Sequence, residues 1–470
     1  MFPANVYSER RRKLRNEISG GIILFLGNQE VPFNYLANTY TFRQDSNFSY
    51  FFGLDHPDLA GVIDLDEGKD WLFGNDVDID DIIWMGKQPS MKEQGARVGI
   101  EHTAPLKELN DLITKARKGG RTIHIAPAYR GETIIWFSDL LGIPHLELPK
   151  HVSQPLVKAI VKLRMKKDAI EIAEIEKAID VAWLMHTTAM KMAKPGVIER
   201  EIAGTIEGIA SANCGPVSFP VILSINGQTL HNHYHGNTLT EGRMMVIDTG
   251  CETELHYASD ITRTVPVGGK FNARQKGIYE VVLNTNLAAT KAVKPGVPFK
   301  EIHLLAATEI AKGLTALGIM KGDPAEAAKK GAHTLFFPHG LGHPMGLDVH
   351  DLEGMGENVV GYDEEVTRSK EFGLAFLRFG RKLQEGFVMT IEPGIYFIPE
   401  LIDIWKSENK LAEFINYDVV ETYKDFGGIR IEDDVLVTAT GHRVLGRPIP
   451  KTVEEIEEVM KEQGNRVTED

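Results

Sequence analysis

Two aspartates stand at the facing ends of two neighbouring apolar runs in the stretch DTGCETELHYASDITRT, residues 248–264. Asp248 follows the run 244–247, and Asp260 precedes Ile261. The glycine and the polar residues between them are typical of a turn, so the two runs are expected to pair as neighbouring strands. Pairing would bring two carboxylates together inside a sheet, where like charges repel and the loss of water is costly. Positive charge is therefore expected between them.

The composition is that of an ordinary soluble globular protein. The chain has 470 residues, of which 43% are hydrophobic and 25% charged, and this length predicts two to three domains. The formal net charge of −14 argues against nucleic acid or an anionic membrane as the main partner. Cys214 and Cys251 are the only cysteines, which excludes a disulfide framework and a cysteine-based zinc site. The absence of a signal-peptide core and of an apolar run long enough to span a bilayer favours a cytoplasmic location.

The first part of the chain predicts an α/β domain with no obvious chemistry of its own. A helix is expected over 9–18, buried strands over 21–28 and 121–129, and a strand, a turn and a second strand over 49–65. No Gly-rich phosphate loop and no Ser-His-Asp order occurs in this part. A linker is expected near Met165–Asp168, within a helical pattern that runs from Leu156 to Ala193.

Two segments of the second part resemble each other. AKPGVIEREI (193–202) and VKPGVPFKEI (293–302) share Lys-Pro-Gly-Val and Glu-Ile at an offset of one hundred residues. Each follows a helical run, opens another and precedes strand-like segments. Chance recurrence of a Pro-Gly turn between helices is one explanation. The other is a duplicated αβ half, which would build a two-fold-like domain with a cleft between its halves.

Three later stretches share the acidic and histidine character of the first one. FFPHGLGHPMGLDVHD (336–351) carries three histidines, GFVMTIEPGIYF (386–397) ends an apolar run on Glu392, and GGIRIEDDVLVT (427–438) places Arg430 and Glu432 on one face of a strand. Taken singly, each has an ordinary structural explanation, such as a strand cap, a surface ion pair or a hydrogen-bonded histidine. Taken together, four acids beside apolar strands and one histidine are the ligand types of a two-metal site.

The donor set indicates the kind of metal. Four carboxylates and one imidazole form an oxygen-rich site that suits Mn²⁺ or another divalent first-row ion better than thiolate-seeking metals. Four carboxylates also balance the charge of two dications. A hydroxide that bridges two such ions would be a nucleophile at neutral pH. Two metal ions between Asp248 and Asp260 would therefore explain why both strands carry an acid.

Four motifs resemble, in order and near-spacing, those of the pita-bread metallopeptidases, which include aminopeptidase P, prolidase and methionine aminopeptidase. The motifs are VIDTGCETELHYASDITRT, HGLGHPMGLDVHD, TIEPGIY and GIRIEDD. FRQDSNFSYFFGLDHPDLAG (42–61) is in addition similar to the N-terminal domain of the aminopeptidase P and prolidase branch. The resemblance implies an α/β (α+β) fold: an N-terminal α/β, creatinase-like domain (1–165), a catalytic pita-bread domain of two related αβ halves around a curved antiparallel sheet (166–450), and a C-terminal helix and tail (451–470).

The resemblance also implies roles for individual residues. It assigns five metal ligands, which are Asp248, Asp260, His343, Glu392 and Glu432. One ion would be held by Asp248 and the other by His343 and Glu392, with Asp260 and Glu432 bridging the two.

Further residues are assigned to catalysis and to the substrate. Glu392 would handle the proton of the attacking hydroxide, while His350 and His231 would stabilise the oxyanion. His339 would line a proline pocket, and Tyr396 and Arg430 would lie on the substrate side and orient the carboxylate ligands.

Some of these assignments have alternatives. His233 and His235 stand beside His231, which is preferred because it lies seventeen residues before Asp248. A histidine-rich surface hairpin explains the two extra histidines better than a third metal site. Phe336, Phe337 and Pro338 could form a wall of the proline pocket or only pack the core. The segment 352–385 is expected to be an inserted loop that shapes access.

The function implied is an Xaa-Pro aminopeptidase, a metallopeptidase with two divalent ions, preferably Mn²⁺, that releases the N-terminal residue from peptides with proline in second position. Prolidase, which hydrolyses Xaa-Pro dipeptides, shares every motif and is the alternative. A metal-free creatinase-like enzyme or a non-catalytic peptide-binding relative should lack a ligand, and none is missing. The family tends to form dimers or tetramers, so a homodimer or homotetramer is expected.

Overall fold

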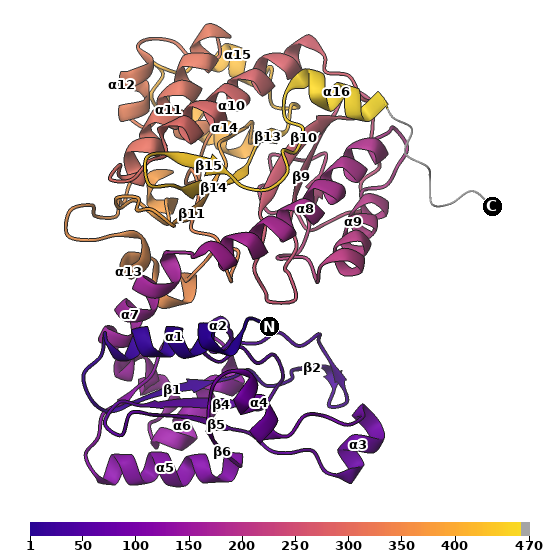
Figure 1. Ribbon diagram of the computed structural model, residues 1–470. Helices are drawn as coiled ribbons and strands as arrows, with labels where there is room; N and C mark the ends of the chain where they lie inside the picture. The colour runs from indigo at the N-terminus through magenta and orange to yellow at the C-terminus, as the bar shows by residue number, and fades with distance from the viewer. Residues whose placement is uncertain (462–470) are drawn as a thin grey trace. The chain divides into compact units, whose positions relative to one another are not determined.

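The computed structural model describes residues 1–461, which fall into two compact units (Figure 1). The N-terminal unit comprises Met1–Arg164 together with Leu352–Val359, and the C-terminal unit comprises Met165–Asp351 and the described residues 360–461. The first boundary lies at the end of helix α7 (Gln154–Met165), close to the expected linker. The C-terminal helix is α16 (Val453–Lys461), and the expected tail beyond it lies outside the described residues.

The N-terminal unit is built on a five-stranded mixed sheet with the strand order β6-β5-β4-β1-β7. The strands are β1 (Ile22–Leu26), β4 (Ala60–Asp64), β5 (Lys69–Phe73), β6 (His102–Ala104) and β7 (Ile123–His124). β1 pairs antiparallel with β4 and parallel with β7, and all of its residues are buried, as a central strand covered on both faces requires. Apolar side chains of this sheet share one core with Leu109, Ile113 and Phe137 from two flanking helices.

Helices and a small hairpin complete this unit. The helices are α1 (Ala4–Arg15), α2 (Ser46–Phe52), α3 (Ile79–Met85), α4 (Met91–Arg97), α5 (Leu106–Lys118), α6 (Gly131–Leu141) and α7. The hairpin consists of β2 (Pro32–Tyr35) and β3 (Asn38–Thr39). The helix expected over 9–18 is confirmed by α1, and the strand expected over 21–28 is confirmed by β1.

The strand expected at the start of 49–65 is wrong, because this segment begins as the last part of helix α2. The Asp45 side chain caps the helix by accepting hydrogen bonds from two backbone N–H groups, and Gly53 ends it in the left-handed conformation, at φ 67°. The aromatic side chains Phe48, Phe51 and Phe52 are fully buried. This aromatic run has strand propensity, but it is helical because both ends of α2 are capped and its aromatic side chains are buried. The strand expected over 121–129 is reduced to the two residues of β7.

The C-terminal unit contains two three-stranded antiparallel sheets and a two-stranded ladder. The first sheet has the order β10-β9-β8, the second β11-β14-β15, and the ladder pairs β12 with β13. The strands are β8 (Ile222–Ser224), β9 (Met244–Thr249), β10 (Ile261–Pro266), β11 (Val388–Ile391), β12 (Gly394–Tyr396), β13 (Gly428–Arg430), β14 (Asp433–Val437) and β15 (His442–Val444).

Long helices lie around these strands (Figure 1). They are α8 (Ala169–Met192), α9 (Glu199–Asn213), α10 (Ala273–Ala292) and α11 (Phe299–Ala316), joined by the shorter α12 (Pro324–Lys329), α13 (Glu357–Gly361), α14 (Pro399–Ser407) and α15 (Tyr417–Glu421). α8 packs on β9 and β10, whereas α10 packs on β11, β12 and β13. No helix among residues 1–461 is both long and apolar enough to cross a membrane.

The two Pro-Gly segments are structurally equivalent, so the duplicated half is confirmed. The first joins α8 to α9 and the second joins α10 to α11, with Gly196 at φ 90° and Gly296 at φ 83°. The Gly196 amide donates to the Leu239 carbonyl and the Gly296 amide to the Leu383 carbonyl, both at 2.8 Å. The same strand-like bridge follows in both, Ile198 to Thr238 and Pro298 to Lys382. Chance does not explain a matched hydrogen-bond pattern one hundred residues apart.

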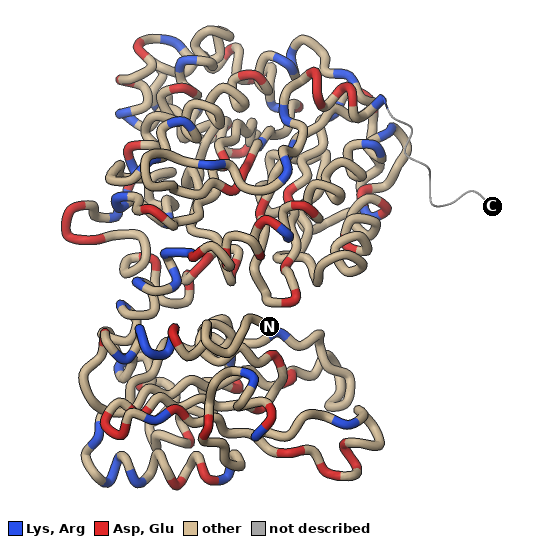
Figure 2. The backbone as a smooth tube through the Cα atoms, in the orientation of Figure 1, with Lys and Arg blue, Asp and Glu red and all other residues tan. Residues whose placement is uncertain are grey.

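The two halves meet where β10 runs beside the break between β13 and β14. β9 and β10 pair in the register that places Thr262 opposite Asp248, so Asp260 lies diagonally to Asp248, just before β10 begins. Glu432 lies in the break, and its amide donates to the Thr262 carbonyl at 3.0 Å. This junction brings acids of both halves together. Figure 2 shows acidic residues at these central strands as well as on the outer helices.

The expected insertion 352–385 is not a single loop. Its first residues, 352–359, belong to the N-terminal unit, and it contains α13 and two short 3₁₀ turns. The remainder returns to β11, and the bridge of Pro298 to Lys382 places its last residues beside the second Pro-Gly segment. The end of this segment is therefore part of the second αβ half.

Candidate metal centre

Ligand atoms of three acidic and histidine side chains from three separate segments converge in the C-terminal unit. One oxygen each of Asp260 and Glu432 and one nitrogen of His343 all lie within 4.8 Å of one another, and all three residues are buried. Asp260 comes from the start of β10, Glu432 from the break before β14, and His343 from the loop after α12. Atoms this close around one point are the geometry that a metal ion requires.

The other two expected ligands lie beside this cluster. His343 Nε2 is 3.3 Å from Asp260 Oδ2 and 3.6 Å from Glu392 Oε1. The carboxyl groups of Asp248 and Asp260 are close enough to interact directly. The structure therefore brings together all five residues expected to hold metal.

Hydrogen bonds turn His343 and Glu392 toward the cluster. His343 Nδ1 lies 3.0 Å from the Pro344 carbonyl, which can only accept, so Nδ1 carries the hydrogen and the lone pair of Nε2 is available to a metal ion beside the acids. The Thr390 hydroxyl accepts from the His343 amide at 3.0 Å and donates to Glu392 Oε1 at 3.3 Å. One threonine on β11 thus orients an expected imidazole ligand and an expected carboxylate ligand.

Arg430 is the buried cation of the site. Its Nη2 donates to Asp248 Oδ2 at 2.5 Å, its Nη1 to the Tyr396 hydroxyl at 2.8 Å, and its Nε to the Thr262 hydroxyl at 3.2 Å. The Thr262 hydroxyl donates in turn to Glu432 Oε2 at 2.7 Å. The planar guanidinium therefore holds acids of both halves in a fixed orientation.

The carboxylates of the site outnumber this cation. The raised pKa values of three of them reflect the missing positive charge. Burial, followed by the charge of Asp260, raises the pKa of Glu432 well above its usual value. Burial and the charge of Asp248 do the same to the pKa of Asp260. Burial raises the pKa of Glu392 to about 7, although His343 and Arg430 oppose it. Without added positive charge these acids would take up protons.

The residues present fit divalent metal ions. Two buried oxygens, Asp248 Oδ1 and Glu432 Oε1, accept no hydrogen bond from any residue of the described chain. Buried carboxylate oxygens without a partner are costly, and metal ligation satisfies them. The four carboxylates and one imidazole are hard donors, which suit a divalent first-row ion.

Two of the expected histidines lie against this cluster. The His350 ring is half-buried and meets the His343 ring edge to face, with centroids 4.3 Å apart. His339 Nδ1 is 2.8 Å from the Gly340 carbonyl, so its Nε2 accepts from the Tyr396 hydroxyl at 2.9 Å. Arg430, Tyr396 and His339 therefore form one continuous hydrogen-bonded chain.

His231 lies exposed on the loop between β8 and β9, near enough to Arg430 and Asp248 for their charges to influence its pKa. Partial burial and then Arg430 lower its pKa, while Asp248 opposes this. The neighbouring histidines face the backbone instead: ring nitrogens of His233 and His235 lie 3.4 Å and 3.1 Å from the Val221 carbonyl.

Phe336 and Phe337 are fully buried, so both pack the core. The Phe337 ring also meets the His339 ring edge to face, with centroids 4.8 Å apart. Phe337 therefore supports the expected substrate-side histidine from behind instead of forming an open wall.

Sequence reasoning missed three supporting residues: Thr262, Thr390 and Asp434. Asp434 is fully buried, and its Oδ2 accepts from the Asp260 amide at 3.1 Å. Its neighbour Asp433 faces the other way and pairs with Arg263 at 2.7 Å. The segment IEDDV could have revealed Asp434, because residues two apart in a strand share a face and Asp434 stands two residues after Glu432. Asp434 therefore belongs with Glu432.

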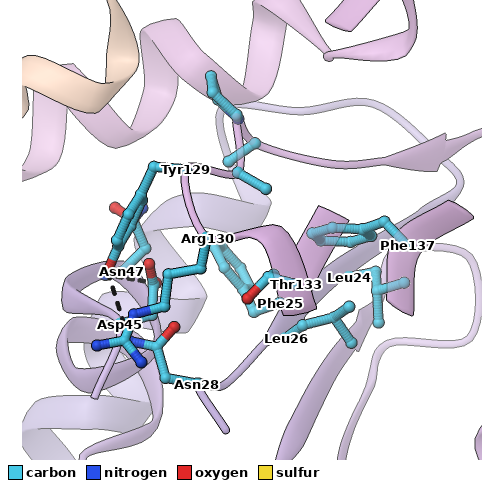
Figure 3. Close-up of a pocket in the computed structure, with 13 residues that line it drawn as sticks. Leu24, Phe25, Leu26, Asn28, Asp45, Asn47, Tyr129, Arg130, Thr133 and Phe137 are labelled. Carbon is cyan, nitrogen blue, oxygen red and sulfur yellow. Dashed lines mark hydrogen bonds between the residues drawn. The ribbon is translucent and has the colours of Figure 1, made fainter. Parts of the chain in front are cut away.

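A pocket in the N-terminal unit offers no comparable chemistry (Figure 3). It lies at the end of β1 and the start of α6, and its polar side chains already serve the fold. Asp45 caps α2, Asn28 donates to the Arg43 carbonyl at 2.8 Å, and Arg130 donates to the Gln29 carbonyl at 3.3 Å. These three side chains are therefore engaged in holding the fold.

Comparison with known proteins gives two family matches. Metallopeptidase family M24 matches residues 173–439, and the aminopeptidase P N-terminal domain matches residues 7–125. The chain is 34% identical to the Xaa-Pro dipeptidase of Homo sapiens over 461 residues, which covers 96% of this chain and 91% of that protein. It is also 34% identical to a probable Xaa-Pro aminopeptidase of Botryotinia fuckeliana over 427 residues, covering 90% and 88%.

Solved structures agree with these matches. An Escherichia coli aminopeptidase P variant in complex with substrate has a TM-score of 0.80 and 28% identity, with 98% of each chain covered. A zinc-substituted form of the same enzyme in complex with product matches with the same TM-score, identity and coverage.

Removing divalent metal with a chelator is expected to lower the thermal midpoint of unfolding, because the clustered acids lose their counter-charge. This decrease in the thermal midpoint should be larger at about pH 8 than at about pH 6. The folded pKa of Glu392, about 7, exceeds its ordinary 4.5, so its proton stabilises the metal-free fold. That stabilisation is complete at a pH below the ordinary pKa of 4.5, and it disappears as the pH rises through the folded pKa of about 7. Differential scanning calorimetry with and without chelator measures the difference.

Asp260→Asn provides the matched variant, since it keeps the shape and removes one charge. Its bound metal, measured by elemental mass spectrometry, should fall sharply, and the chelator should then shift its midpoint little. Asp418→Asn, at an exposed position of the same unit, is the control and should behave as the unaltered protein. An unaltered protein stripped of metal with an unchanged midpoint at the higher pH would contradict the electrostatic account.

Proposed function

The chain belongs to metallopeptidase family M24, joined to an aminopeptidase P N-terminal domain, and we propose that it is an Xaa-Pro aminopeptidase. It would release the N-terminal residue from peptides with proline in second position. The observation that carries the proposal is the convergence of Asp260, His343 and Glu432, with Glu392 and Asp248 beside them. Metallopeptidases take their name from such a metal site. A relative named Xaa-Pro dipeptidase and another named probable Xaa-Pro aminopeptidase each align with most of this chain.

Two divalent ions, preferably Mn²⁺, would be held by these five side chains. The resemblance of the motifs assigns Asp260 and Glu432 to both ions, and these two residues form the tightest part of the cluster together with His343. Asp248, on the side of Arg430, would hold one ion, while His343 and Glu392 would hold the other. When bound, the ions supply an activated water and a Lewis acid for the peptide carbonyl.

Glu392 is suited to move the proton of the attacking water. Its side chain is 17% exposed, compared with 7% for Asp260, so it lies at the more open side of the cluster. The Thr390 hydroxyl fixes one of its oxygens, and the other is 3.9 Å from His339 Nδ1. A carboxylate held beside the reacting group and partly exposed can accept and return a proton.

His350 and His231 are proposed to stabilise the oxyanion. His350 lies against the ligand His343, and His231 interacts electrostatically with Arg430 and Asp248. Hydrogen-bond donors placed where negative charge develops contribute strongly to peptide hydrolysis. The two histidines come from opposite halves of the unit.

The substrate side is proposed to consist of His339, Tyr396 and Arg430. The bond before proline is a tertiary amide without an N–H, and proline has a fixed φ. A site that selects this bond therefore has to recognise the ring. The His339 ring is held by the Tyr396 hydroxyl and backed by Phe337, so it offers a fixed surface for a pyrrolidine.

Prolidase activity is the second candidate, because the human Xaa-Pro dipeptidase aligns with 96% of the chain. The two activities differ in whether a residue follows the proline. Both would use the same metal ligands, so the centre itself does not distinguish them. The length of the accepted peptide does.

We expect hydrolysis of Xaa-Pro-Yaa tripeptides to exceed that of the Xaa-Pro dipeptide, with little activity on matched Xaa-Ala-Yaa peptides. The measurement is kcat/KM for the three substrates with Mn²⁺ added. A tripeptide to dipeptide ratio well below one would identify a prolidase. Equal rates on the alanine peptides would remove proline recognition from the proposal.

His350→Ala is expected to keep its metal and lose turnover by roughly 10²–10³, the effect of losing one oxyanion donor. His231→Ala should also lose turnover. His233→Ala is the matched control, two residues away on the same loop, and should be nearly neutral because its ring faces the Val221 carbonyl. Metal content is measured together with kcat. A variant that has lost a metal ligand should lose metal, whereas one that has lost only an oxyanion donor should keep its metal. Equal damage from the two loop variants would refute the choice of His231.

We also propose a homo-oligomer, a dimer or a tetramer, formed through the N-terminal unit. The hairpin β2–β3 exposes large apolar side chains, with Tyr35 63% and Leu36 88% exposed. Helix α3 has no buried residue and exposes Ile83 at 69% and Trp84 at 86%. Apolar groups this exposed are costly unless another surface covers them.

Light scattering after size exclusion should give a multiple of the chain mass. Leu36→Ser with Trp84→Ser should lower this mass, because contact area would be lost. Leu317→Ser, which removes a 40%-exposed leucine of the C-terminal unit, should leave it unchanged. A monomeric unaltered protein would contradict the proposal.

A further inference from the structure

The fold brings the two cysteines of the chain together. Cys214 caps the C-terminal end of α9, and Cys251 lies just beyond β9, where it forms an isolated antiparallel bridge with Val217. The Glu252 amide, the next along the chain, donates to the Pro216 carbonyl at 2.9 Å. The two backbones therefore run side by side at this point. The side chains of Cys214 and Cys251 are near enough for each to influence the pKa of the other.

The two thiols differ in accessibility. Cys214 is partly exposed, whereas Cys251 is completely buried and its Sγ donates to the Ala178 carbonyl at 3.4 Å. An oxidant from solvent can therefore reach Cys214 but not Cys251. Neither sulfur has a role in the metal centre or in the substrate site described above.

The surroundings also differ in what they do to the thiolate. The interaction with Cys251 lowers the pKa of Cys214, while burial and the charges of Glu174 and Glu254 oppose this and Lys177 assists it. The same interaction, with burial, raises the pKa of Cys251. A partly exposed thiol with a lowered pKa beside a second, buried thiol is the arrangement of cysteines that respond to oxidants.

We propose that Cys214 and Cys251 are a peroxide-reactive pair, in which Cys214 is oxidised first and Cys251 then closes an intramolecular disulfide. The oxidant is hydrogen peroxide or an organic hydroperoxide. Its reduction to water or alcohol supplies the two electrons that the disulfide requires.

The chemistry balances in two steps. The Cys214 thiolate attacks a peroxide oxygen, an S–O bond forms, the O–O bond breaks, and the departing hydroxide takes a proton to become water. The Cys251 sulfur then attacks the Cys214 sulfur, an S–S bond forms and the S–O bond breaks. The second hydroxide leaves with the Cys251 proton as water. Two thiols and one hydrogen peroxide thus give one disulfide and two waters.

The bridge would join the end of α9 to the strand pair that carries two expected ligands. The Cys251 amide donates to the Ser259 hydroxyl at 3.1 Å, and the Ser259 amide donates to the Cys251 carbonyl at 3.0 Å. Ser259 directly precedes Asp260, and Cys251 follows Asp248 by three residues. The disulfide would also close the loop from 214 to 251, which contains β8 and β9, and restrict the unfolded chain.

The test treats the folded protein with hydrogen peroxide and follows free thiols and intact mass. The two thiols should fall to none, the mass should fall by two hydrogens, and the thermal midpoint should rise. Dithiothreitol should reverse all three changes. Peptide mapping without reduction should recover one peptide pair that joins residues 214 and 251.

Matched variants separate the two steps. Cys251→Ser should stop at the sulfenic acid of Cys214, which dimedone captures as a single adduct. In Cys214→Ser, the buried Cys251 thiol should be oxidised at least about tenfold more slowly than the thiols of the unaltered protein. The double variant carries the same fourteen methionines and reports their oxidation as added oxygen.

Three results would overturn the proposal. They are survival of both thiols at a peroxide dose that oxidises methionine, a disulfide between two chains, and loss of the Cys214→Ser thiol at the unaltered rate. Peptide mapping of the unaltered protein decides the matter even where a serine variant fails to fold. None of these readouts depends on peptide hydrolysis, so the outcome is separate from that of the proposed function.

Discussion

The C-terminal unit depends on one electrostatic constraint: several buried carboxylates share a single buried guanidinium. Arg430 contacts Asp248 directly and reaches Glu432 through the Thr262 hydroxyl. One positive charge does not neutralise these acids together with Asp260 and Glu392. The raised pKa values of three of the acids and the unpartnered oxygens of two residues express this deficit. Divalent metal ions held by these residues would remove this deficit of positive charge and stabilise the centre.

The duplicated architecture explains why the centre lies where it does. The first half supplies Asp248 and Asp260 from β9 and β10, and the second supplies His343, Glu392 and Glu432. Neither half alone gathers enough donors. The hydrogen bond from the Glu432 amide to the Thr262 carbonyl joins the halves at this point. Assembly of the metal centre therefore requires both halves to be packed.

A layer of threonines, acids and backbone groups sets the direction of each ligand. Thr390 orients His343 and Glu392, while Asp434 holds the amide of Asp260. The cysteine pair extends this layer, because Cys251 is bonded through Ser259 to the segment that begins β10. The turn between the two aspartates of the first half thus also carries Cys251, which we propose closes a disulfide after peroxide has oxidised Cys214.

The sequence alone indicated the candidate ligand residues, the duplication and the family, because each is visible in short motifs along the chain. It did not determine the N-terminal helix α2, where capping by Asp45 and burial override the strand propensity of an aromatic run. It also missed Asp434, although Asp434 shares the face of Glu432. Only the tertiary structure decided that Asp260 lies diagonal to Asp248, and that Cys214 meets Cys251. Strand register and contacts between distant segments arise from packing, which local residue patterns do not encode.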